Sequence, residues 1–181
     1  MDDNGELTGK NFYFAVDSVN EGAAVVHGLT VERLAKLSSG KKFFDVIEEV
    51  IPDFGAASLL VAHNIKFDLT FLAAEAHRWG FSLTEILKID RVCTMHDTTY
   101  FCKLPGKHGS YKWPRLNELL ECLNIQIKEV EDFCRNVFGD FEGFHDSRFD
   151  VAATYLAYKM AVEQGIIEGG IDNGRQTNVS A

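Results

Sequence analysis

The chain has 181 residues, 46% of them hydrophobic and 25% charged, which fits one globular domain with a single core. Its formal net charge of −9 argues against a large, non-specific surface that neutralises nucleic-acid phosphates. That charge is compatible with a nuclease, because clustered carboxylates hold the cations that meet a phosphate. No apolar run approaches the ~20 residues that cross a bilayer, and the polar start MDDNGELTGK is unlike a secretory signal, so we expect a cytoplasmic protein without a membrane partner.

The cysteines do not indicate a disulfide framework. They are Cys93, Cys102, Cys122 and Cys134. No two form a C-x-x-C pair, so we predict reduced thiols. Cys93 and His96 have a spacing found in metal sites, but no second close pair completes the four ligands of a zinc site.

The first part of the chain begins with a predicted strand. Residues 12–16, FYFAV, are aromatic and β-branched, as strands are. We expect a loop over residues 26–30. Its last residue, Thr30, is placed to cap a short helix over residues 31–37.

A helix, a strand and a second helix follow. Residues 42–51 carry apolar side chains at helical spacing, and we expect Pro52 to end that helix. Residues 58–62, SLLVA, are short and apolar, which predicts a strand covered on both faces. Residues 67–79 predict a helix, which Gly80 ends.

The second half of the chain is dominated by helices. Residues 89–93 predict a third strand, and residues 97–102 predict a short helix. After a Gly/Pro-rich loop, Pro114 fits the first turn of a leucine-rich helix. Residues 125–143 resemble an insertion with one acidic helix, and a last helix is expected over residues 147–164.

Strands that alternate with helices predict an α/β layered domain. We assign residues 1–165 to this domain and residues 166–181 to a disordered polar tail. In such domains, functional sites collect where strands end and helices begin.

Two groups of polar side chains occupy such positions. Asn64 and Asp68 follow the second predicted strand. His145 precedes the last helix, and Asp150 lies in its opening turns. A histidine on a lead-in loop suits a base that moves toward a water, while a carboxylate on a helix suits a cation. Taken singly, these residues have simpler explanations: Asp68 is a helix cap or dipole partner, Asn64 a turn residue, and the His145-x4-Asp150 pair a chance occurrence. Likewise, Phe67 is explained as a core residue and His27 as a loop residue without a task.

In combination these motifs resemble the DEDDh family of 3′→5′ exonucleases, especially its proofreading, epsilon-type members from bacterial DNA polymerase III. The motifs that carry the resemblance are, in chain order, His27-Gly28-Leu29, Asn64-x-x-Phe67-Asp68 and His145-x4-Asp150. The resemblance covers roughly residues 7–158 and is weakest over residues 96–144.

The resemblance implies an RNase H-like fold with a mixed sheet and two-metal hydrolysis of phosphodiester bonds at DNA 3′ ends, in proofreading, repair or DNA turnover. It implies Mg²⁺ or Mn²⁺ held by Asp68 and Asp150, with His145 as the general base. It further implies substrate-binding residues at the terminal nucleotide, namely His27, Gly28, Leu29, Asn64 and Phe67. The implied partners are single-stranded DNA or DNA 3′ ends, and a DNA polymerase subunit.

One part of the family pattern has no counterpart here. The family holds its cations with four carboxylates, two of them in an Asp-x-Glu motif on the first strand. Asp2, Asp3 and Glu6 lack that spacing and its flanking β-forming residues, so we assign none of them. Without the first strands the sheet would lack its centre, leaving unpaired backbone groups on the strand at residues 58–62.

Three explanations for the missing motif are open. The first, which we favour, is an upstream segment that carries the motif, so that the whole protein is an active exonuclease. The second is a degenerate relative that binds nucleic acid or a partner without cutting. The third is another chain that supplies the missing strands.

Overall fold

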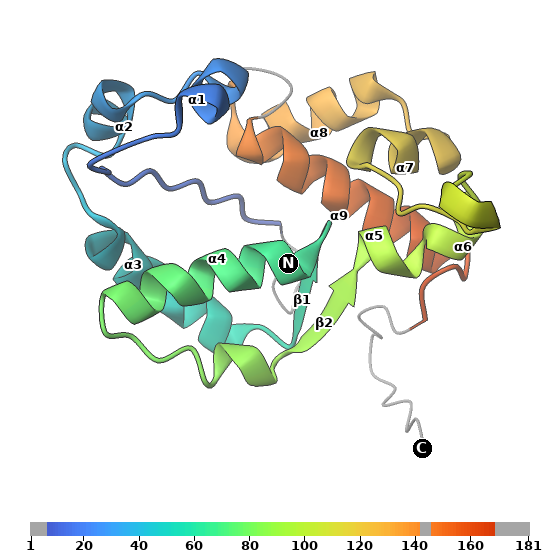
Figure 1. The fold of residues 1–181 in the computed structure, drawn as a ribbon, viewed down its shortest axis with the longest axis horizontal. Helices are drawn as coiled ribbons and strands as arrows, with labels where there is room; N and C mark the ends of the chain where they lie inside the picture. The colour runs from blue at the N-terminus through green and yellow to red at the C-terminus, as the bar shows by residue number, and fades with distance from the viewer. Residues whose placement is uncertain (1–6, 142–145, 169–181) are drawn as a thin grey trace.

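The computed structural model describes residues 7–141 and 146–168. This part of the chain is mostly helical, with a small parallel sheet (Figure 1), so the predicted α/β class is confirmed. The elements are α1 (Glu21–His27), α2 (Val31–Leu37), α3 (Phe43–Ala56), β1 (Leu59–Ala62), α4 (Ile65–Arg78), β2 (Asp90–Cys93), α5 (Thr94–Asp97), α6 (Thr99–Cys102), α7 (Leu116–Cys122), α8 (Ile127–Phe138) and α9 (Ser147–Glu163). Short 3₁₀ turns lie at Ile86–Lys88 and Lys107–Gly109. No helix in the described ranges is long and apolar enough to cross a membrane.

The sheet consists of β1 and β2, and both were predicted from the sequence. They run parallel, in register from Leu59 opposite Asp90 to Ala62 opposite Cys93. Helix α4 connects them, and α9 packs on β1. The side chains of β1 are half-buried rather than covered on both faces. Within residues 7–141 and 146–168, β2 is the one strand that pairs with β1.

The predicted strand at residues 12–16 is wrong. Aromatic and β-branched residues form a strand only where a neighbouring strand completes the hydrogen-bond ladder. Here the Ala15 N–H donates instead to the Lys41 carbonyl, 2.7 Å away. Phe14 packs edge-on against Phe43 with 5.4 Å between ring centroids. This segment therefore serves as an extended cover for the start of α3.

The region expected as a loop at residues 26–30 begins inside a helix. Asn20 caps α1, its side-chain oxygen accepting from the Ala23 N–H at 3.1 Å. Gly28 ends α1 in the left-handed conformation, with φ of 67°, which glycine adopts without strain. The next helix, α2, is confirmed together with its cap, since Thr30 Oγ1 accepts from the Arg33 N–H at 3.2 Å.

Pro52 lies inside α3 and does not end it, which corrects the sequence prediction. Proline removes one helical hydrogen bond and crowds the preceding turn. Burial on both sides of Pro52 holds the helix together. Val46 and Ile47 are buried before it. Phe54, after it, packs against a second cluster that includes Leu83.

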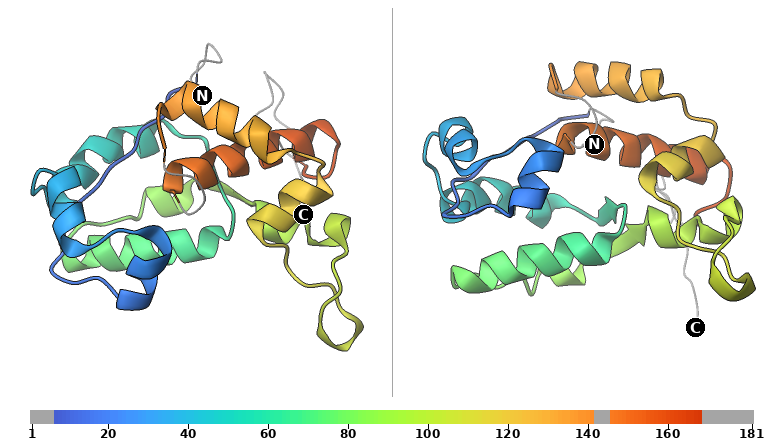
Figure 2. Two further views of the ribbon diagram at one scale, coloured as in Figure 1. Left: turned by 90° about the horizontal axis from the view of Figure 1, so that it is seen from above. Right: turned by 45° about the horizontal axis from the view of Figure 1, so that its top comes forward.

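The largest core lies between α7, α8 and α9, which lie side by side in Figures 1 and 2. Its buried residues are Leu119, Leu120, Leu123, Ile125, Val130, Cys134, Phe149, Ala152, Ala153 and Ala157. Helices α8 and α9 were predicted, and α8 contributes Val130 and Cys134 to this core. Pro114 precedes the N-cap Arg115 of α7 instead of lying in its first turn.

The chain after α9 folds back on this body. Ile167 is 5% exposed, and Ile166 packs against the same core. The remainder of the predicted tail, from residue 169, lies outside the described residues.

Candidate functional site

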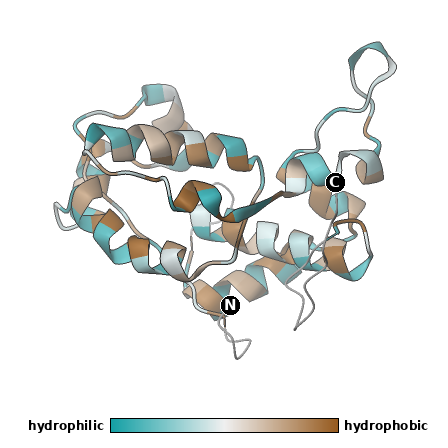
Figure 3. Ribbon diagram, turned by 90° about the horizontal axis from the view of Figure 1, so that it is seen from below, coloured by the Kyte–Doolittle hydropathy of each residue, from teal (hydrophilic) through white to brown (hydrophobic). Residues whose placement is uncertain are grey.

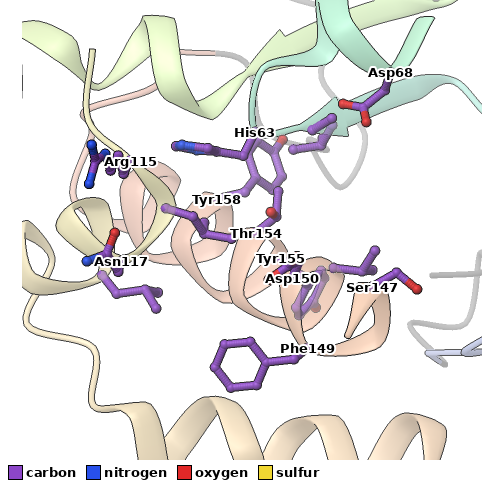
Figure 4. A pocket seen from close by; sticks show the side chains of 15 residues that line it. His63, Asp68, Arg115, Asn117, Ser147, Phe149, Asp150, Thr154, Tyr155 and Tyr158 are labelled. Atoms are coloured by element: carbon purple, nitrogen blue, oxygen red, sulfur yellow. The ribbon is translucent and has the colours of Figure 1, made fainter. Parts of the chain in front are cut away.

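A cavity of about 1060 Å³ opens where β1 ends and where α4, α7 and α9 begin (Figure 4). Its walls are apolar where Val61, Leu120 and Phe149 contribute. The polar side chains that face it come from all four elements and their flanking residues: His63, Asp68, Arg115, Asn117, Ser147, Asp150, Thr154, Tyr155 and Tyr158. The cavity therefore lies at the carboxyl end of a parallel strand, the position where sites are expected in α/β domains.

Asp68 reaches the cavity from the first turn of α4. The chain leaves β1 and turns at Asn64, which adopts a left-handed conformation with φ of 75° as the N-cap of α4. Asp68 stands at the exposed mouth of the cavity. Partial burial raises the pKa of its carboxyl, an effect that a hydrogen bond with its own backbone opposes.

Asp150 reaches the same cavity from the first turn of α9. Asp146 caps this helix by accepting from the Arg148 N–H at 3.0 Å and also pairs with the Arg148 guanidinium at 2.6 Å. These contacts fix the start of α9 and so the position of Asp150. Two carboxylates far apart in the sequence thus share one cavity.

His63, which sequence reasoning did not single out as a site residue, forms part of the cavity wall. Its Nε2–H donates to the Pro114 carbonyl at 3.1 Å, and its Nδ1 lies 3.0 Å from the Thr94 hydroxyl. Burial lowers the pKa of His63, and the bond to Pro114 partly opposes that shift. We therefore describe His63 as a neutral clamp between β1 and the segment that leads into α7. The sequence signal that could have identified His63 is its position directly after the strand β1.

The other predicted site residues within the described part of the chain do not line the cavity. His27 ends α1, and its Nδ1 accepts from the Leu29 N–H at 3.0 Å across Gly28. Phe67 is 64% exposed and stacks on Phe71 at 6.3 Å between ring centroids. The alternative explanation of Phe67 as a core residue is therefore wrong. Whether these side chains bind a nucleotide stays a prediction.

The predicted base, His145, lies outside the described residues. Within residues 7–141 and 146–168, no three His, Cys, Asp or Glu side chains gather as a metal site. Asp68 and Asp150 are hard oxygen donors, and Mg²⁺ is often held by one or two carboxylates together with substrate phosphates. The described carboxylates supply donors of the type that Mg²⁺ takes, and within these residues they do not complete a two-cation site.

All four cysteines are free. The pKa of Cys102 is raised to about 12, mainly by burial and to a smaller extent by a hydrogen bond with Cys122.

Comparison with known proteins confirms the predicted resemblance at a distant level. The chain is 31% identical over 109 residues to DNA polymerase III subunit epsilon of Buchnera aphidicola subsp. Acyrthosiphon pisum. The aligned segment covers 58% of this chain and 43% of that protein, so the chain spans less than half the length of this relative. No family model matches the chain, and no solved structure matches it significantly.

Proposed function

We propose that this chain is a domain of a 3′→5′ exonuclease with an RNase H-like fold, which removes nucleotides from DNA 3′ ends in proofreading, repair or DNA turnover. The observation that carries the proposal is the meeting of Asp68 and Asp150 on one cavity, in a chain that is similar to an epsilon subunit. The likeness alone would be compatible with many activities. A pair of carboxylates on one cavity adds a place where a phosphodiester and a cation can meet.

Each proposed residue has a distinct role. Asp68 and Asp150 would hold Mg²⁺ or Mn²⁺ together with the substrate phosphate. The bound cation would stabilise the charge that develops on the phosphate. We propose His145 as the base that takes a proton from the attacking water. Contacts to the terminal nucleotide are assigned to His27, Gly28, Leu29, Asn64 and Phe67.

The wider assignments rest on the same likeness. We propose that residues 1–165 form the exonuclease domain and that its partners are single-stranded DNA or DNA 3′ ends. A DNA polymerase subunit is a further proposed partner, since the relative is named as a subunit of DNA polymerase III.

The test is degradation of a 5′-labelled single-stranded DNA by the full chain in Mn²⁺. We expect a ladder that shortens from the 3′ end and that is lost in His145→Ala and Asp150→Asn. Asp132→Asn, on the exposed face of α8, is the matched control and should keep the ladder. Calorimetry with Mn²⁺ gives a second readout, in which Asp150→Asn should weaken binding and Asp132→Asn should not. Equal Mn²⁺ affinity in all three proteins would remove the metal assignment.

A second candidate function is a binding module that engages nucleic acid or a protein without cutting. The observation that favours it is the small donor set, two carboxylates at the cavity and no group of three among the described residues. Binding of single-stranded DNA without any ladder, in wild type and His145→Ala alike, would select this candidate.

A further inference from the structure

A stretch of the chain next to the cavity is basic, although the protein as a whole is acidic. Residues 98–117 contain four of the 18 Lys and Arg residues and none of the 27 Asp and Glu residues. Lys112 pairs with Glu118 at the start of α7. The other cations, Lys103, Lys107 and Arg115, form no ion pair in the part of the chain that the structure describes.

Most of this stretch is a loop that projects from the body of the molecule (Figures 2 and 3), and the outer part of the loop is coloured as hydrophilic in Figure 3. Its two arms are tied together. Pro105 and Tyr111 form an antiparallel bridge, and the Gly106 N–H donates to the Ser110 carbonyl at 2.8 Å. The two arms lie so close together that a Cβ on Gly106 would be 2.8 Å from the Ser110 carbonyl oxygen. The loop therefore presents its side chains from a braced backbone.

Aromatic rings are exposed on and beside this loop. Tyr100 is 78% exposed, Trp113 59% and Tyr111 44%. Tyr100 and Tyr111 meet edge-to-face, with 6.1 Å between ring centroids, and Trp113 packs on His96 at 4.5 Å. Exposed rings that are held by neighbours offer faces on which nucleic-acid bases stack.

The loop is continuous with the cavity. The His63 imidazole bonds the Pro114 carbonyl, which attaches the base of the loop to the cavity wall. The next residue, Arg115, lines the cavity, and Trp113 lies two residues before it. A strand lying along the loop would thus pass from exposed rings and lysines to Arg115 and then into the cavity.

We infer that residues 100–115 form a docking surface for single-stranded nucleic acid, whose bases stack on Tyr100, Tyr111 and Trp113 and whose phosphates meet Lys103, Lys107 and Arg115. Charge complementarity selects this occupant, because a strand with one negative charge per nucleotide meets a segment without acidic residues. The surface deepens the proposed function, on which it rests only for the direction in which the strand runs.

The experiment is fluorescence anisotropy of a labelled oligothymidine with the full chain in EDTA, so that no cleavage is needed. Tyr100→Leu with Tyr111→Leu should weaken binding at least about fivefold, because stacking on an aromatic ring adds appreciably to affinity. Tyr100→Phe with Tyr111→Phe keeps both rings and should bind like wild type. Circular dichroism melts of each variant confirm that these exposed changes leave the fold intact.

A salt series tests the cations. Lys103→Gln, Lys107→Gln and Arg115→Gln together should flatten the slope of log affinity against log salt by about 2, at ~0.7 per phosphate contact on a single strand. Lys36→Gln, Lys128→Gln and Lys159→Gln together, on α2, α8 and α9, remove the same number of charges as the matched control and should leave the slope unchanged. Unchanged affinity and slope in the loop variants would overturn the inference.

Two further outcomes separate the explanations. Equally tight binding of an oligoglutamate peptide, lost in the lysine variants but not in the tyrosine variants, would assign the loop to an acidic protein instead. A chain that binds the strand through this loop but forms no ladder in Mn²⁺ would keep the inference and remove the exonuclease proposal. If the chain forms a ladder but the loop variants bind the strand with wild-type affinity, the exonuclease proposal is kept and this inference is removed.

Discussion

The helical body formed by α7, α8 and α9 and the region of residues 7–56 are both rich in helices, yet they are held together differently. In the body, Leu119, Val130 and Cys134 are 0% exposed. In residues 7–56, helix α2 has no buried residue. The buried apolar side chains of that region are Phe43, Val46 and Ile47, all of which lie in α3. Short helices gain most of their stability from packing. Similar local signals therefore give a stable helical body in one region and weakly packed helices in residues 7–56.

The largest expected effect is on the core of the body. Leu119→Ala should lower the free energy of unfolding by ~2–5 kcal/mol, because it leaves a cavity between packed helices. Leu37→Ala makes the same truncation on α2 at a side chain that is 44% exposed, and it should change stability by less than about 0.5 kcal/mol. Urea titrations of both variants measure the difference. Comparable losses would mean that the two regions are packed alike.

The junction between β1 and the segment before α7 should be the next most sensitive. His63→Phe leaves the Pro114 carbonyl and the Thr94 hydroxyl without this partner, at a cost of ~1–3 kcal/mol. His63→Gln keeps a donor and should lose less. If both variants melt like wild type, the clamp contributes nothing to stability.

The same histidine predicts a dependence on pH. Burial lowers the pKa of His63, so the unfolded chain binds a proton more readily than the folded chain does. This contribution to stability is fully present above the unfolded pKa of about 6.5 and is lost as the pH falls through that value toward the folded pKa. Urea midpoints between pH 8 and pH 5 should therefore fall more steeply in wild type than in His63→Phe. Parallel curves would remove His63 as the cause.

A smaller and local effect is expected at α2. Thr30→Ala removes the hydroxyl that caps this helix and should cost ~1 kcal/mol of helix stability. Because α2 buries no side chain, the loss should appear as faster amide exchange in α2, with little change in α9. Thr30→Ser, which keeps the cap, is the control. Slower exchange in α2 than in α9 in wild type would contradict the comparison itself.

The smallest effect is expected at the surface pair of Lys10 and Asp53, which joins the extended cover to α3 at 2.6 Å. Both side chains are nearly half exposed, so a double-mutant cycle with Lys10→Gln and Asp53→Asn should give a coupling of ~0–1 kcal/mol. The coupling should shrink in high salt. A coupling well above that range would show that this pair, and not apolar burial, holds the cover in place.

Much of the candidate site could be predicted because its signals are local. Asp68 follows an apolar strand, and Asp150 opens a long amphipathic helix; both reach the cavity. His63 was not singled out, since a histidine after a strand has no distinctive spacing. Its role depends on Pro114, a residue remote in the sequence.

The two incorrect predictions about the fold also involve contacts with residues remote in the sequence. The FYFAV segment has strand propensity but no strand to pair with, so Ala15 bonds Lys41 and Phe14 covers Phe43. Pro52 is a helix breaker by local rules, yet burial before and after it keeps α3 continuous. In each case a tertiary contact outweighs a local preference, of at most ~1 kcal/mol for strand propensity and ~3 kcal/mol for a proline inside a helix.

The sequence by itself determined the elements with strong local causes: β1 by its apolar run, α2 by the Thr30 cap, and α9 by its apolar face. It also carried the motifs that resemble epsilon-type exonucleases. Only the tertiary structure brought Asp68, Asp150 and Arg115 to one cavity and braced the basic loop beside it. The physical reason is that propensity and capping act over a few residues, whereas a site is assembled by packing between segments that the chain order keeps apart.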